Sequence, residues 1–273
     1  MPVSALLFAL AAAFVHALWN ILLARAKDPE AATAVALVVA EIAFAPVAWL
    51  VWRADHAVWP YIAGSAALHL VYFVLLAAAY RRAELSVVYP LARGTAPVLV
   101  LVVGVAAFAA PHSPGQVLGV CLVGFGILLV RGLRRPAKGN GVAFGLVIAC
   151  CIAAYTLNDH SGIAHANPIA YLEAALLFPA LIYAAGTAAL KGPRALAAEV
   201  SFSVVLAGLA TFGAYALVLA ALARAPAAPV AAVRETSVVI AAALARILLH
   251  ERVGPARIAG AVLVAGGVAL LSF

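Results

Sequence analysis

Two arginines lie inside apolar stretches of the chain, where a charge is costly. Arg93 stands between Pro90 and Pro97 in the sequence YPLARGTAPV, and Arg234 directly precedes Glu235 in AAVRETSVV. A guanidinium binds carboxylates and other anions through a planar fork of N–H donors. A charge at membrane depth costs at least about 2.5–3.5 kcal/mol, so each arginine should face protein or water rather than lipid. The two arginines therefore predict either an anion-binding site or an internal ion pair.

Three glutamates in the same kind of apolar stretch keep other interpretations open. Glu235 is adjacent to Arg234, and Glu41 and Glu173 lie farther away in the chain. These carboxyl groups suit a structural ion pair, a proton or gating role, or the binding of a cationic drug or metabolite.

Polar and aromatic residues recur at helical spacing in the apolar stretches. His16 and Asn20 are four residues apart with Trp19 between them, and Tyr155 and Asn158 repeat the pattern. Residues three or four apart share one face of a helix. Such a stripe suits the wall of a cavity and equally suits hydrogen bonds between helices. The predicted cavity residues are His16, Trp19, Asn20, His69, Tyr72, Tyr89, Arg93, Tyr155, Asn158, Tyr215, Arg234 and Glu235.

The sequence offers no grouping for catalysis or metal binding. Asp159, His160 and His165 lack a distinctive ligand spacing, and the three cysteines lie in apolar stretches as small hydrophobic residues. There is no Walker A sequence, no HExxH and no GxSxG. A membrane-embedded enzyme would need paired carboxylates or a nucleophile near the headgroups. We therefore expect no enzyme, no cofactor and no metal, and transport driven by gradients, proton coupling or exchange.

The elements that must position these residues are membrane helices. Hydrophobic residues make up 67% of the chain and charged residues 10%, against about 25% charged in soluble domains. The basic residues are dispersed, which argues against a nucleic-acid partner and for a lipid bilayer. Ten stretches have the length to span it: residues 3–24, 31–52, 58–80, 85–108, 114–130, 141–160, 168–190, 202–223, 227–249 and 255–273.

The distribution of lysine and arginine predicts the orientation. Loops after even-numbered helices hold only Arg53 and Arg224. By the positive-inside rule the basic loops are cytoplasmic, so both termini should lie outside the inner membrane. The loops and helix ends on the other side hold Arg25, Lys27, Arg81, Arg82, Arg131, Arg134, Arg135, Lys138, Lys191, Arg194, Arg246, Arg252 and Arg257.

An internal repeat places the two arginines in equivalent positions. Residues 1–138 and 139–273 are predicted to form two five-helix repeats, and because five is odd, the second should be inverted, as in many secondary transporters. Arg93 and Arg234 then approach the membrane midplane from opposite faces, about 12 and 10 Å deep. Residues 85–130 align without gaps on 226–271, pairing Arg93 with Arg234, Thr95 with Thr236, Gly119 with Gly260, and Gly126 with Gly267.

Prolines predict an irregular helix around the first arginine. Pro97 follows Arg93 by four residues and displaces its carbonyl from helical bonding, and Pro90 does the same to Ser86. We therefore expect a kink in the helix over 85–108. Pro226 and Pro229 belong to a first helical turn, where proline disturbs the helix less.

Several sequence motifs resemble one transporter family. HALWN near the N-terminus, YPLARGTAP, RETSVV and the following HER, within ten helices in two repeats, are similar to EamA-domain transporters of the drug/metabolite transporter superfamily. The resemblance implies an inner-membrane carrier of small metabolites, such as amino acids, nucleosides, sugars or drugs. It also implies a central cavity between helices 1, 3, 4, 6, 8 and 9. One departure is Glu251, which has no acidic counterpart after the fourth helix.

Together these features predict a secondary transporter that works by alternating access around a midplane cavity. We expect it to export a small metabolite with a carboxylate or another anionic group, with a cationic drug or metabolite as the alternative.

Overall fold

The protein is described by a computed structural model that covers residues 1–273 except 24–25, 84, 111, 132–139, 250–253 and 273. Several residues used in the orientation and family predictions therefore lie outside the described residues: Arg25, Arg134, Arg135, Lys138, His250, Glu251 and Arg252. The side chains of Ser86, Pro90, Arg131 and Arg246 lie outside them too.

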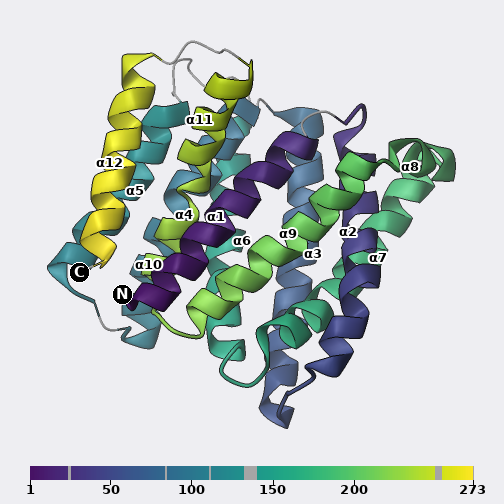
Figure 1. The fold of residues 1–273 in the computed structure, drawn as a ribbon, viewed down its shortest axis with the longest axis horizontal. Helices are drawn as coiled ribbons and strands as arrows, with labels where there is room; N and C mark the ends of the chain where they lie inside the picture. The colour runs from purple at the N-terminus through teal and green to yellow at the C-terminus, as the bar shows by residue number, and fades with distance from the viewer. Residues whose placement is uncertain (24–25, 84, 111, 132–139, 250–253, 273) are drawn as a thin grey trace.

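The described chain is all helical (Figure 1). Its elements are α1 (Val3–Leu23), α2 (Pro29–Leu50), the 3₁₀ helix η1 (His56–Val58), α3 (Trp59–Arg82), α4 (Leu85–Phe108), α5 (Pro114–Arg131), α6 (Gly141–Gly162), α7 (Pro168–Lys191), α8 (Pro193–Glu199), α9 (Phe202–Leu222), α10 (Ala227–Arg234), α11 (Ser237–Leu249) and α12 (Pro255–Ser272).

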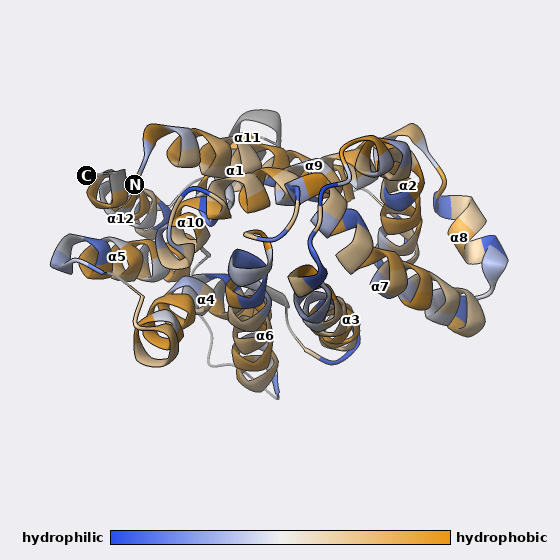
Figure 2. Cartoon of the chain, turned by 90° about the horizontal axis from the view of Figure 1, so that it is seen from below, coloured by the Kyte–Doolittle hydropathy of each residue, from blue (hydrophilic) through white to orange (hydrophobic). Residues whose placement is uncertain are grey.

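Helix length and hydropathy agree with a multi-pass membrane protein. Among the described residues, seven helices are long and apolar enough to cross a membrane, and the helices at Pro114–Val130 and Pro255–Leu271 are shorter but apolar. Hydrophobic residues cover the helices along most of their length, and hydrophilic residues gather at helix ends and connections (Figure 2).

Most predicted helix boundaries lie within two residues of the observed ones, and local capping explains the differences. The second helix begins at Pro29 rather than at residue 31, because Asp28 accepts hydrogen bonds from the backbone N–H groups of Glu30 and Ala31. The short helix α8 was not predicted.

One predicted span is wrong as a single helix. Residues 227–249 form α10 and α11, which are separated at Glu235 and Thr236. Helix α4, where prolines predicted an irregularity, runs as one α-helix from Leu85 to Phe108. The interruption therefore occurs in the segment that the repeat alignment makes equivalent to α4.

Two helices at one edge of the molecule pack closely through glycines (Figure 1). A Cβ on Gly119 would meet the carbonyl oxygen of Gly267 at 2.9 Å, and one on Gly126 would meet that of Gly260 at 2.7 Å. Because the pairing order reverses along the chain, α5 and α12 run antiparallel. Glycine is required here because the backbones approach too closely for a side chain.

Ionic contacts connect helix ends away from that edge. Lys191, which ends α7, contacts Asp28 and Glu30, and Arg81 of α3 also contacts Glu30. Burial alone would raise the pKa of Asp28, but hydrogen bonds from Lys191 and from backbone N–H groups outweigh it and lower the pKa. These contacts hold the start of α2 against the ends of α3 and α7.

Candidate functional site

Both buried arginines contact the same carboxylate. Arg93 Nη1 of α4 lies 3.1 Å from Glu235 Oε1, and Arg234 Nη2 of α10 lies 3.0 Å from the same oxygen. The side chains of these residues are almost completely buried, with 7%, 4% and 0% exposed for Arg93, Arg234 and Glu235. We call Arg93, Arg234, Glu235 and His16 the arginine cluster.

The break between α10 and α11 positions Glu235. The backbone N–H of Glu235 donates to Ala232 O at 3.1 Å, and that of Thr236 donates to Val233 O at 3.0 Å. These bonds span three residues instead of four, so the chain tightens into a 3₁₀-type turn. Thr236 Oγ1 also donates to Val233 O, which satisfies the backbone at the break. Non-helical backbone at membrane depth is tolerated where protein or an aqueous cavity surrounds it.

His16 of α1 has a donor at each ring nitrogen. Arg93 Nη2 lies 2.9 Å from Nε2, and Trp19 Nε1 lies 3.1 Å from Nδ1. A neutral imidazole has one acceptor nitrogen, and a protonated one has none. His16 therefore accepts from only one of these two donors.

The charges of the arginine cluster do not cancel. Two guanidinium groups share Glu235, and Arg93 also lies over the ring of Tyr89, with 5.4 Å from Cζ to the ring centroid. Asp159, a buried carboxylate on α6, accepts hydrogen bonds from the hydroxyls of Tyr171 at 2.8 Å and Tyr215 at 2.6 Å. The direct contacts therefore leave the arginine cluster with one positive charge in excess.

Aromatic side chains from α3, α6 and α9 form a second group. It includes Tyr215, whose hydroxyl donates to Asp159. The His69 ring stacks on Tyr155 at 4.4 Å and meets Tyr215 edge to face at 5.5 Å. Tyr72 meets Tyr155 edge to face at 6.0 Å. We call His69, Tyr72, Tyr155 and Tyr215 the aromatic cluster. Tyr155 interacts electrostatically with both arginines, so the two clusters are neighbours.

The structure groups ten of the twelve predicted cavity residues and separates two. His16, Trp19, Tyr89, Arg93, Arg234 and Glu235 lie at the arginine cluster, and His69, Tyr72, Tyr155 and Tyr215 form the aromatic cluster. Asn20 donates instead to the His16 carbonyl within its own helix. Asn158 donates to the Tyr61 carbonyl at 2.8 Å, so it faces α3 and not the arginines.

Two buried groups near the clusters were missed as site residues. Asp159 was weighed as a metal ligand and is not among the twelve predicted cavity residues, but it lies within α6 and is 0% exposed. Its partner Tyr171 is in α7. A buried aspartate in an apolar helix is itself a signal of a polar partner.

Asp159, His160 and His165 do not come together: among the described residues, no three His, Cys, Asp or Glu side chains are grouped so that they could hold a metal ion. His160 contacts the Leu222 carbonyl, and His165 contacts Asp55 Oδ2 at 3.0 Å.

Two glutamates predicted as possible ion partners stay apart from the arginine cluster. Both carboxyl oxygens of Glu41 and Oε2 of Glu173 are buried without a hydrogen-bond partner. The ion pair expected at membrane depth is therefore formed by Glu235 alone among these three glutamates.

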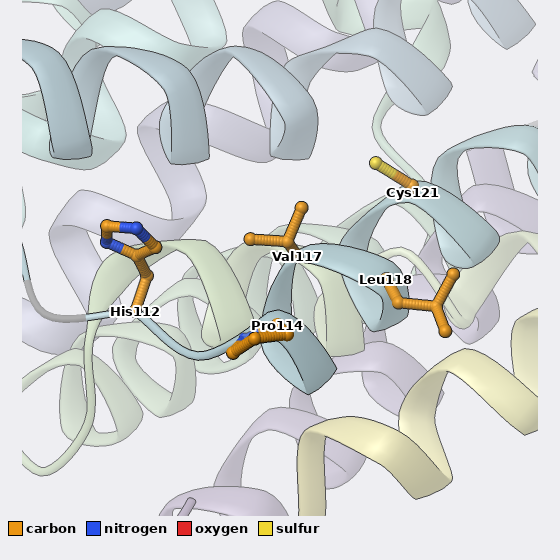
Figure 3. A pocket seen from close by; sticks show the side chains of 5 residues that line it. All are labelled: His112, Pro114, Val117, Leu118 and Cys121. Atoms are coloured by element: carbon orange, nitrogen blue, oxygen red, sulfur yellow. The ribbon is translucent and has the colours of Figure 1, made fainter.

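A hollow on the surface lies away from both clusters. His112, Pro114, Val117, Leu118 and Cys121 line a shallow pocket of about 500 Å³ where α5 begins (Figure 3). Its lining is mostly apolar, and it does not include a residue of either cluster.

Comparison with known proteins identifies the fold and the family. A search of curated protein sequences finds no similar protein. A crystal structure with 16% sequence identity superimposes with a TM-score of 0.78, over 99% of this chain and 96% of that chain, and shows a shared fold. The model of the EamA-like transporter family matches residues 3–132 and again residues 139–273. A multi-pass helical chain that matches this family twice along its length belongs to the EamA-like transporter family of the drug/metabolite transporter superfamily.

Proposed function

We propose that this chain is a secondary transporter that exports a small metabolite with a carboxylate or another anionic group. The observation that carries the proposal is the pair of buried guanidiniums on a single carboxylate, Glu235. An anion can take the place of Glu235 or His16 on one guanidinium without leaving a buried charge unpaired.

The aromatic cluster supports binding of the rest of such a molecule. Rings of Tyr72, Tyr155 and Tyr215 offer apolar faces and hydroxyl groups close to the arginines. Ligand sites combine such surfaces with a few polar groups that orient the ligand.

Alternating access fits the burial of the arginine cluster. Arg93 and Arg234 are 6% and 3% exposed, which describes a closed site that must open to admit a substrate. The break between α10 and α11 offers a hinge beside Glu235, since hinges are often element-terminal residues that absorb changes in backbone angles.

An inverted arrangement of the repeats is part of the proposal. The repeat alignment pairs Gly119 with Gly260 and Gly126 with Gly267, which makes α5 and α12 equivalent. Their antiparallel contact supports an inverted relation between the halves. In a five-helix repeat, α1 is equivalent to α6 and α3 is equivalent to α9. The contact of α1 with α9 in one direction therefore corresponds to the contact of α6 with α3, and both contacts are present.

Ligand binding to the purified protein tests the anion site. We expect anionic members of a metabolite panel to raise the melting temperature of the wild type and not of Arg93→Ala or Arg234→Ala. Arg224→Ala is the matched control, because Arg224 is exposed and contacts the Ala220 carbonyl. The anion-site proposal fails if both cluster variants bind and transport, in inside-out vesicles, every anion that the wild type does.

The unpaired carboxyl groups of Glu41 and Glu173 favour a second candidate, export of a cationic drug or metabolite. Competition with a labelled ligand across pH distinguishes the two. Displacement by organic cations that is lost at low pH supports the cation, and displacement by carboxylates supports the anion.

A further inference from the structure

Two glutamates in neighbouring helices are buried without the partners that buried carboxylates need. Glu41 of α2 is 5% exposed and Glu173 of α7 is 9% exposed, and α2 packs against α7. Both oxygens of Glu41 and Oε2 of Glu173 lack a hydrogen-bond partner. Glu173 lies close enough to Glu41 for the two carboxyl groups to interact electrostatically.

Apolar side chains pack along the same helices on both sides of Glu41. Leu37, one turn before Glu41 on α2, packs in one cluster with Phe73 of α3 and Ala180 of α7. On the other side of Glu41 in the helix, Phe44 stacks on Phe212 of α9 at 4.1 Å.

The third acidic residue on these two helices shows what is missing here. Glu30, also on α2, contacts Arg81 and Lys191. The titratable groups on the packed elements have other contacts. Tyr72 and His69 of α3 and Tyr215 of α9 belong to the aromatic cluster. Tyr183 of α7 lies against Phe73, and Glu199 of α8 accepts a hydrogen bond from the Asp28 backbone N–H.

A carboxylate cannot remain charged in such a place without a cation. Desolvation disfavours the ionised form, and a second carboxylate nearby disfavours it further. A bound proton removes the charge and turns one carboxyl oxygen into a hydrogen-bond donor.

We propose that Glu41 and Glu173 form a proton-binding site between α2 and α7, separate from the arginine cluster. The site is the place where a proton enters the transport cycle. Phe73 links it to the centre of the molecule, because its ring contacts Tyr183 of α7 and lies 6.4 Å from the ring of His69 in the aromatic cluster. Movement of α2 against α7 that opens the site to water releases the proton and also displaces α3.

Infrared difference spectroscopy of the purified, substrate-free protein during a pH titration tests the site. We expect the carbonyl band of protonated carboxylic acids to be present at neutral pH and to disappear at alkaline pH. The band should weaken in Glu41→Gln and in Glu173→Gln and should be absent in the double variant. Glu30→Gln is the matched control, since Glu30 lies on the same helix with cationic partners, and it should leave the band unchanged.

The glutamine variants are isosteric and uncharged, so they should fold, and the melting temperature of each is measured alongside. If the titrating band is the same in the double variant as in the wild type, the proton site is refuted. If sodium chloride removes the band at constant pH, the pair binds a metal cation in exchange for the proton and the proton-specific proposal is wrong.

These outcomes are independent of the proposed anion site. The pH titration uses no substrate. Anion binding to the Glu41→Gln variant is measured separately by melting temperature, and it depends on Arg93 and Arg234 rather than on the two glutamates. If the double glutamine variant loses the band and Glu41→Gln still binds anions, both proposals are supported. If the double variant keeps the band and Glu41→Gln still binds anions, only the proton site is refuted.

Discussion

Glu235 is the residue on which the charge balance of the protein interior depends. Its carboxylate is 0% exposed and lies between Arg93 and Arg234, and His16 contacts the outer side of Arg93. Removal of one partner from a buried ion pair leaves an uncompensated charge, which is far more costly than loss of an exposed pair.

We therefore expect Glu235→Gln to destabilise the protein by about 3–5 kcal/mol, because two guanidiniums would remain buried without a carboxylate. Denaturant unfolding in detergent, followed by tryptophan fluorescence, measures the loss. Asp55→Asn is the control, since Asp55 pairs with His165 at the surface and its change should have little effect. Equal stability of the wild type and Glu235→Gln would contradict the role of Glu235 as a shared counter-ion.

At the scale of elements, α5 and α12 are held together by a close contact between their backbones. The backbones meet at Gly119 with Gly267 and at Gly126 with Gly260, where an added Cβ would collide with the carbonyl oxygen of the opposite glycine. The broken pair α10 and α11, in contrast, carries Glu235 at a turn with altered hydrogen bonding.

Two adjacent glycines of α12 provide a matched test of this contact. A Cβ on Gly267 would meet Gly119 O at 2.6 Å, whereas one on Gly266 would meet nothing within 4 Å. Gly267→Ala should lower stability by about 1–3 kcal/mol through overpacking. Gly266→Ala should raise it by up to about 1 kcal/mol through helix propensity. Thermal unfolding in the same detergent measures both, and similar shifts in the two variants would mean that α5 and α12 do not pack this closely.

At the scale of the whole molecule, the two termini lie at the same end. The amino group of Met1 donates to the Leu271 carbonyl at 3.3 Å, and both ends of the chain appear together in Figure 1. A chain that crosses the membrane an even number of times has both termini on the same side. The distribution of basic loops predicts that this shared side is outside the cell membrane.

Reporter fusions check that orientation. Alkaline phosphatase, which is active only outside the cytoplasm, should be active when fused after residue 54 or residue 273 and inactive when fused after residue 138. A fluorescent protein that folds only in the cytoplasm should give the reverse pattern. Phosphatase activity after residue 138 alone would place the termini in the cytoplasm and would reverse the predicted orientation.

Much of this fold follows from local features of the sequence. The apolar stretches predicted most helices within two residues, because helix length in a membrane depends on hydropathy and on caps such as Asp28 and Pro29. The repeat alignment singled out Arg93 and Arg234, since charges are rare at membrane depth. The break at Glu235 was not predicted, and it lies in the segment equivalent to α4, which itself continues through Pro97.

By itself, the sequence determined that the chain is a multi-span membrane protein with a repeated arginine, and it limited the candidate partners of that arginine to a few acids. Only the tertiary structure decided that Glu235 serves both arginines, that Asp159 is bound by tyrosines, and that Glu41 and Glu173 have no partner. The physical reason is that hydropathy acts along each helix, whereas these pairings depend on how helices distant in the chain rotate and pack against one another.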